Sequence, residues 1–109
     1  MNQPFSVDQP ARADIDAMPG PALLQFATDW CGHCKAAQAP VQQALQDFPG
    51  VRHMKVEDGP GRALGRSYAV TLWPTLVFLR DGQEVGRLVR PVDSAPVREQ
   101  LAQLVGSPG

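Results

Sequence analysis

The segment Trp30-Cys31-Gly32-His33-Cys34-Lys35 contains both cysteines of the 109-residue chain. The two thiols lie at the point where a strand-like apolar run, Ala22 to Ala27, gives way to a helix-like pattern. A cysteine at the start of a helix favours the thiolate, which is the reactive form in thiol–disulfide exchange. The spacing therefore predicts a redox-active pair rather than a structural one, because so short a span constrains the unfolded chain very little.

The bulk composition indicates one ordinary globular domain covering 1–109. With 10 basic and 11 acidic residues, a net charge of -1 gives no electrostatic footprint for nucleic acid or an anionic membrane. No apolar run reaches the about 20 residues of a membrane-spanning helix. The first residues resemble no export signal, which favours a cytoplasmic location. A signal removed earlier would leave the periplasm open.

Hydrophobic periodicity and turn residues predict the order of elements along the chain. Residues 1–20 are expected to be loosely ordered or to hold a short helix at 11–18, and 107–109 to form a frayed tail. Between them we expect, in order, a strand at 22–27, a helix from Cys31 to about Phe48 with Pro40 inside it, a strand at 51–57, a short helix at 62–68, a hairpin at 75–79 and 84–90, and a final helix that begins at Asp93 or Ser94 and stops at Gly106. A strand–helix–strand crossover followed by a hairpin predicts an α/β fold with a mixed central sheet and helices on both faces.

The chemistry of the cysteine pair follows from this placement. Cys31 at the helix start would meet free backbone N–H groups that lower its pKa, whereas Cys34, one turn further in, should be more buried and resolve a mixed disulfide. Gly32 leaves the sulfur accessible, and His33 can stabilise the thiolate and make the disulfide more oxidising. Trp30 offers a flat apolar surface beside the pair.

Other uses of the pair are weaker. A closed zinc site needs ligands beyond two cysteines, and only His33 and His53 could add to them. His33 lies between the cysteines, where a compact tetrahedron is hard to close, so no metal is expected. A copper carrier would need another loop and fold, and two inert cysteines do not suit this flanking sequence.

Two motifs together resemble those of the thioredoxin superfamily. The first is Phe26 with the segment 30–35, and the second is Tyr68 through Trp73-Pro74-Thr75, followed by the apolar run 76–78 and by Asp81-Gly82. The resemblance covers roughly residues 20–106, and the Gly-His pair between the cysteines is similar to that of protein disulfide isomerases. It implies a thioredoxin-like fold in which Pro74 is cis and faces the cysteines, with Trp30, Trp73, Pro74 and Thr75 at the substrate. No cofactor is implied beyond the Cys31–Cys34 disulfide.

Four departures from the family pattern affect what can be carried over. Gln25, six residues before Cys31, replaces a buried acid that takes the proton of the second thiol. Slower resolution, or proton transfer through water or Lys55, is the expected consequence; a plain hydrogen bond of Gln25 within the sheet is the alternative. Trp73 replaces a smaller residue before the cis proline and would cover the disulfide, clamp an apolar side chain or simply pack in the core.

The two remaining departures concern spacing and surface. One extra residue separates Cys34 from Pro40, and Arg90 stands where a glycine often lies, which could alter partner choice. Lys35 could tune the thiolate modestly, and His53 is expected to lie on a strand face without a catalytic duty.

Three functions are consistent with these features. The first is a reductase of protein disulfides, supplied with electrons by a thioredoxin-reductase-like or glutathione source and acting as a monomer. The second is an isomerase or oxidase in an oxidising compartment, favoured by His33. The third is a thioredoxin-like binding module with weak redox activity, for which Gln25 and Trp73 are suggestive.

Overall fold

Four strands form one mixed sheet in the order β2-β1-β3-β4. The computed structural model describes residues 10–28 and 31–106. At the centre, β1 (Pro21–Ala27) runs parallel to β2 (Arg52–Glu57) and antiparallel to β3 (Thr75–Arg80), which pairs antiparallel with β4 (Gln83–Val89). The predicted mixed sheet is confirmed, and the end of β1 carries the chain directly toward the cysteines.

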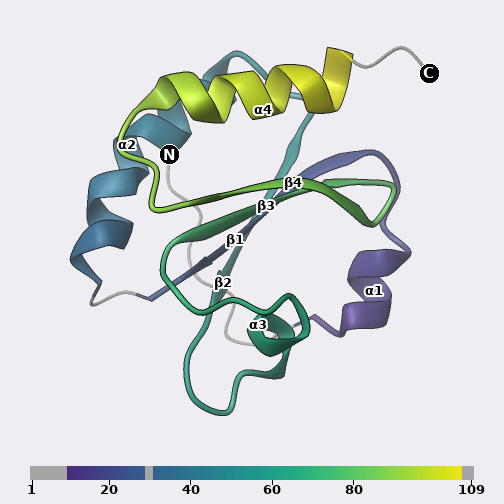
Figure 1. The fold of residues 1–109 in the computed structure, drawn as a ribbon. Coiled ribbons are helices and arrows are strands. Elements are labelled where there is room, and N and C mark those ends of the chain that lie inside the picture. Colours follow the sequence, from purple (N-terminus) through teal and green to yellow (C-terminus); the bar gives the residue numbers. More distant parts are fainter. Residues whose placement is uncertain (1–9, 29–30, 107–109) are drawn as a thin grey trace.

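Helices cover both faces of this sheet, as predicted (Figure 1). The helices α2 (Gly32–Gln46) and α4 (Ser94–Gly106) pack together on one side, and the short helices α1 (Arg12–Asp16) and α3 (Ala63–Ser67) lie on the other. Pro40 lies inside α2, and the helix continues through it. None of the helices in the described residues is long and apolar enough to cross a bilayer.

Alternation along the strands divides the core into two layers. In β1, Leu24 and Phe26 pack with residues of α1 and α3, whereas Leu23 packs with residues of α2 and α4. The same alternation places Gln25 on the face that α2 covers. Gln25 is buried there, so its polar amide must find a partner inside the protein.

The hairpin between β3 and β4 closes through the two residues Asp81 and Gly82, both with positive φ. This is the turn that Asp-Gly predicts between twisted strands. A Cβ atom added to Gly82 would lie 1.9 Å from the backbone oxygen of Asp16. The turn therefore needs glycine for two reasons: its positive φ, and the close approach of the backbone of Asp16, the last residue of α1.

The β3–β4 ladder contains one irregularity near its turn. Phe78 pairs with Gly86 and Leu79 with Glu84, so Val85 is an extra residue on β4. An extra residue of this kind is a β-bulge, which bends the strand and increases its twist. Beyond the other end of β4, the N–H of Arg90 donates to the carbonyl of Pro74 at 2.9 Å and holds the two loops together.

Candidate active site

Cys31 is the N-cap residue of α2. Its backbone is extended, and its sulfur accepts a hydrogen bond from the backbone N–H of Cys34 at 3.4 Å. The N–H groups of a first helical turn have no partner within the helix, so a side-chain acceptor at the N-cap satisfies one of them. The predicted position of Cys31 at the helix start is confirmed.

This geometry favours the Cys31 thiolate. Burial raises the pKa of Cys31, but hydrogen bonds from Cys34 and the backbone of His33, together with the positive charge of Arg90, outweigh it and hold the pKa below its ordinary value. The helix therefore acts through N–H groups aimed at the sulfur, which stabilise an anion there.

Cys34 has the opposite character. It is 4% exposed, and burial raises its pKa to about 11. At neutral pH it is a thiol that can donate a hydrogen bond to Cys31 and must lose its proton before it can attack. The predicted division between an attacking Cys31 and a resolving Cys34 matches these two pKa directions.

The loop before β3 lies against the first cysteine. Cys31 Sγ is 3.7 Å from the carbonyl oxygen of Trp73, and the Trp73–Pro74 peptide bond is cis, as the resemblance implies. The side chain of Trp73 packs against Ala27, Cys31 and Cys34 as well as against the α1–α3 layer of the core. The Trp73 side chain therefore both covers the sulfurs, as predicted, and packs in the core, which was the alternative. Trp30 lies outside the described residues.

Asp58 holds the indole of Trp73 in place, a role that sequence reasoning missed. Trp73 Nε1 donates to Asp58 Oδ2 at 2.9 Å, and the N–H of Asp58 donates to the Ala27 carbonyl at the end of β1. Asp58 is itself buried beside Gly65, where an added Cβ would lie 2.1 Å from its carboxylate. The sequence did contain a signal for this role. Because β1 and β2 are parallel, an acidic residue directly after β2 lies at the same end of the sheet as the cysteines that follow β1.

A polar group lies under α2, on the sheet face opposite the Trp73 layer; it consists of Gln25, His53 and Lys55. Gln25 and Lys55 are paired neighbours on β1 and β2, and His53 Nε2 lies 2.7 Å from Gln25 Oε1. The predicted hydrogen bond of Gln25 within the sheet is thus present. Burial, and to a smaller degree repulsion from Lys55, lowers the pKa of His53 to about 4, so its imidazole is neutral at pH 7.

Lys55 connects this group to the second cysteine. Burial lowers the pKa of Lys55, and attraction to an ionised Cys34 raises it in part. A thiolate at Cys34 and the ammonium of Lys55 therefore stabilise each other.

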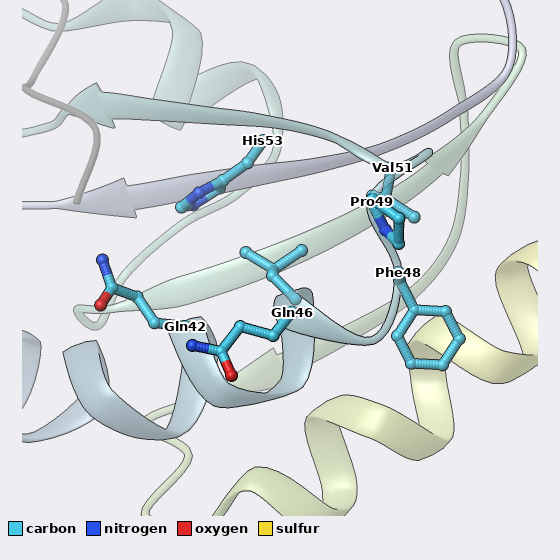
Figure 2. A pocket seen from close by; sticks show the side chains of 7 residues that line it. Gln42, Gln46, Phe48, Pro49, Val51 and His53 are labelled. Atoms are coloured by element: carbon cyan, nitrogen blue, oxygen red, sulfur yellow. The ribbon is translucent and has the colours of Figure 1, made fainter. Parts of the chain in front are cut away.

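His53 also forms part of the wall of a pocket of about 230 Å³ between α2 and β2 (Figure 2). Gln42 and Gln46 of α2 lie opposite His53, and the turn at Phe48, Pro49 and Val51 closes one end. Neither cysteine lines it, so this pocket is separate from the thiol pair.

The remaining predicted site residues occupy the rim or the interior. Three predicted site residues are exposed in the first turn of α2: Gly32, His33 and Lys35. Their roles in access to the sulfur and in tuning the thiolate stay predictions. Thr75 is 1% exposed, and its hydroxyl donates to the Leu72 carbonyl at 2.6 Å. The side chain of Thr75 therefore supports the loop from inside, and the predicted contact between Thr75 and substrate stays a prediction. Among the described residues, no three His, Cys, Asp or Glu side chains are grouped so that they could hold a metal.

Comparison with known proteins agrees with this geometry. The thioredoxin family model matches residues 7–103. The reduced form of thioredoxin 2 from Pseudomonas aeruginosa PAO1 superimposes with a TM-score of 0.87 and 54% identity, covering 97% of this chain and 98% of that one. The mitochondrial thioredoxin-3 of Saccharomyces cerevisiae is 31% identical over 62% of this chain and 53% of its own length. A thioredoxin of Chlamydia trachomatis is 33% identical over 64% of this chain and 69% of its own length.

The chain spans about half the length of the first of these curated relatives. The match to the family model nevertheless extends over nearly all of the residues described above, and it includes both motifs and the helix that carries the cysteines. On this basis the chain belongs to the thioredoxin family.

Proposed function

We propose that this chain is a thiol–disulfide oxidoreductase that reduces disulfides in protein substrates through Cys31 and Cys34. The observation that carries the proposal is the opposite pKa direction of the two thiols, lowered at Cys31 and raised at Cys34, within one helical turn. Such a pair provides a nucleophile that ionises more readily than an ordinary thiol and a second thiol that stays protonated until it is needed.

In the first step the Cys31 thiolate attacks one sulfur of the substrate disulfide. A bond forms between Cys31 Sγ and that sulfur, the substrate S–S bond breaks, and the other substrate sulfur leaves as a thiolate that takes a proton from water. In the second step Cys34 loses its proton and attacks Cys31 Sγ. The Cys31–Cys34 disulfide forms, the second substrate thiolate leaves, and two electrons have passed from the protein dithiol to the substrate.

Removal of the proton from Cys34 is the step at which this chain departs from the family pattern. Gln25 cannot ionise, so it cannot take up the Cys34 proton as a carboxylate would. The buried Lys55 carries a positive charge that attracts an ionised Cys34. We infer that Lys55 stabilises the Cys34 thiolate while the proton passes to water or to the leaving substrate thiolate.

The cycle closes when an external thiol donor reduces the Cys31–Cys34 disulfide: one dithiol, or two molecules of a monothiol, supplies two electrons and is itself oxidised to a disulfide. A thioredoxin-reductase-like donor or glutathione is the proposed source, and a monomer in the cytoplasm, where thiols are kept reduced, is the proposed setting. An isomerase or oxidase remains the second candidate, because His33 lies exposed beside Cys31 and would make the disulfide more oxidising if its charge reaches the thiolate.

The reduction potential tests this proposal. The protein is equilibrated with mixtures of reduced and oxidised glutathione, and its free thiols are counted by alkylation and mass spectrometry, with Cys34→Ser as the control that cannot form the internal disulfide. A potential near about -270 mV supports a reductase, and one near about -180 mV supports the isomerase or oxidase. Failure to form the disulfide, together with no acceleration of the reduction of a disulfide-bonded test protein by dithiothreitol, would overturn both.

A further inference from the structure

Arg90 has an unusual backbone for a residue that is not glycine. It follows β4 with a φ of 53°, in the left-handed region that most side chains avoid. Its N–H donates to the Pro74 carbonyl and its Nε to the Trp73 carbonyl, both at 2.9 Å. A strained residue whose backbone and side chain are both held at a candidate active site suggests a functional role for that side chain.

The Trp73 carbonyl joins Arg90 to the reacting thiol. Its oxygen has two lone pairs, and in the free protein both Arg90 Nε and Cys31 Sγ approach it as donors. When Cys31 becomes a thiolate or part of a mixed disulfide, its S–H is gone and one lone pair is free for a backbone N–H of the substrate. Arg90 stays bound to the other, so its guanidinium lies beside any segment that pairs with Trp73.

Exposed apolar residues lie close in sequence to Arg90 and to Trp73, whose carbonyl Arg90 contacts. Leu72, Val89 and Val92 are each between 45% and 74% exposed, and they flank Trp73 and Arg90 in the chain. Arg90 is half-buried among these loops, and none of the ion pairs formed within residues 10–28 and 31–106 involves it. A positive charge held against the Trp73 carbonyl, with exposed apolar residues near it in the chain, is positioned to discriminate between partners by charge.

Resting on the proposed function, we propose that Arg90 is a specificity residue that favours target disulfides with a carboxylate side chain beside the attacked cysteine. The planar guanidinium keeps one edge on the Trp73 carbonyl and presents further N–H donors to such a carboxylate. A lysine or arginine beside the target cysteine would be repelled.

Three synthetic disulfide peptides provide the test. They are identical except that the residue after the attacked cysteine is glutamate, glutamine or lysine, and kcat and KM are measured for each at low and at high salt. We expect the wild-type protein to reduce the glutamate peptide with a kcat/KM about two- to fivefold above that of the lysine peptide, as one exposed ion pair allows, mostly through KM and less at high salt.

Variants separate this role from a structural one. Arg90→Gln should bring the ratio of the two kcat/KM values close to one, and Arg90→Lys should restore most of the preference. Arg52→Gln is the matched control: Arg52 is exposed and pairs with Ala22, at the end of β1 that lies away from the cysteines. It should keep the wild-type ratio.

The outcomes distinguish the two proposals. A wild-type protein that reduces all three peptides equally, or an Arg90→Gln variant that keeps the preference, overturns the role of Arg90 and leaves the proposed function standing. A loss of kcat that is equal for all three peptides in Arg90→Gln, with the wild-type preference retained, also overturns it, because Arg90 would then act only on the Cys31 thiolate and the loop and not on the charge of the substrate. If the wild-type protein reduces none of the peptides, the proposed function fails and the inference fails with it.

Discussion

Nε2 of His53 lies 2.7 Å from Oε1 of Gln25, beneath the helix that carries both cysteines. Because an amide oxygen only accepts hydrogen bonds, this contact requires the imidazole to carry its proton on Nε2. The neutral imidazole that burial favours therefore donates a hydrogen bond to the buried amide oxygen of Gln25. This bond satisfies a polar atom in an otherwise apolar layer.

This relationship predicts a loss of stability in mild acid. The folded-state pKa of His53 lies at about 4 and its ordinary value is 6.5. The unfolded chain therefore binds a proton first, and the contribution to stability is present above pH 6.5 and is lost as the pH falls toward 4. The full shift corresponds to roughly 3 kcal/mol.

Urea unfolding of wild type and His53→Gln between these pH values measures the effect. The variant lacks a titrating ring and should lose less stability across this window, whereas His33→Gln, which replaces the exposed histidine of α2, controls for the loss of a histidine. Parallel pH profiles for wild type and His53→Gln would contradict the prediction.

Gln25→Glu should accelerate the second step of the exchange. The new carboxylate would lie opposite Lys55 in the β1–β2 ladder and provide an acceptor for the Cys34 proton. We expect release of the second substrate thiol to quicken by roughly tenfold, less than the about hundredfold or more of a well-placed general base. Rapid-mixing single-turnover experiments measure this rate. Gln25→Leu controls for loss of the amide, and no gain in Gln25→Glu at any pH would show that proton removal does not limit resolution.

Alkylation should identify Cys31 as the reactive thiol. In the reduced protein, the rate of modification of Cys31 by iodoacetamide, followed by mass spectrometry, should rise with a midpoint below the ordinary pKa of 9.0. Cys34→Ala removes the neighbouring S–H donor and should move the midpoint upward, because the thiolate loses a hydrogen bond. A wild-type midpoint at or above 9.0 would remove the basis for a ready nucleophile.

Two glycine substitutions should separate backbone strain from crowding. Gly61 and Gly82 have φ values of 80° and 81°, but an added Cβ meets nothing within 4 Å at Gly61 and the Asp16 backbone at Gly82. Gly61→Ala should cost about 1–2 kcal/mol, the price of a left-handed alanine. Gly82→Ala should cost about 1–3 kcal/mol more, because the backbone of Asp16 at the end of α1 must move. Urea denaturation measures both, and equal losses would show that the close approach relaxes freely.

Periodicity and turn chemistry were sufficient for most of the architecture. The Asp81-Gly82 turn and the apolar alternation of β1 and β3 are local signals, and the structure places those elements within a residue or two of the expected bounds. The position of Cys31 at the start of α2 followed in the same way, since a strand that ends before a helix exposes the first turn of that helix.

The partners in the contacts that tune the site lie far apart in the sequence, and local signals did not identify them. The bond between Trp73 and Asp58 joins residues 15 positions apart, and the bond between His53 and Gln25 joins residues 28 positions apart. Arg90 donates to the Trp73 carbonyl from a backbone with a positive φ, a conformation that no propensity predicts for arginine. The hydrogen bond from the Thr75 hydroxyl to the Leu72 carbonyl was not predicted either.

The extra residue at Val85 has a consequence for how this molecule meets extended chains. In the described sheet, β4 is an edge strand, and a straight edge strand is a template on which another polypeptide can add itself and begin to aggregate. The bulge bends that edge, and the Glu84–Arg87 ion pair places charge along it. The bulge and this ion pair therefore make the β4 edge a poor place for another extended chain to pair and aggregate.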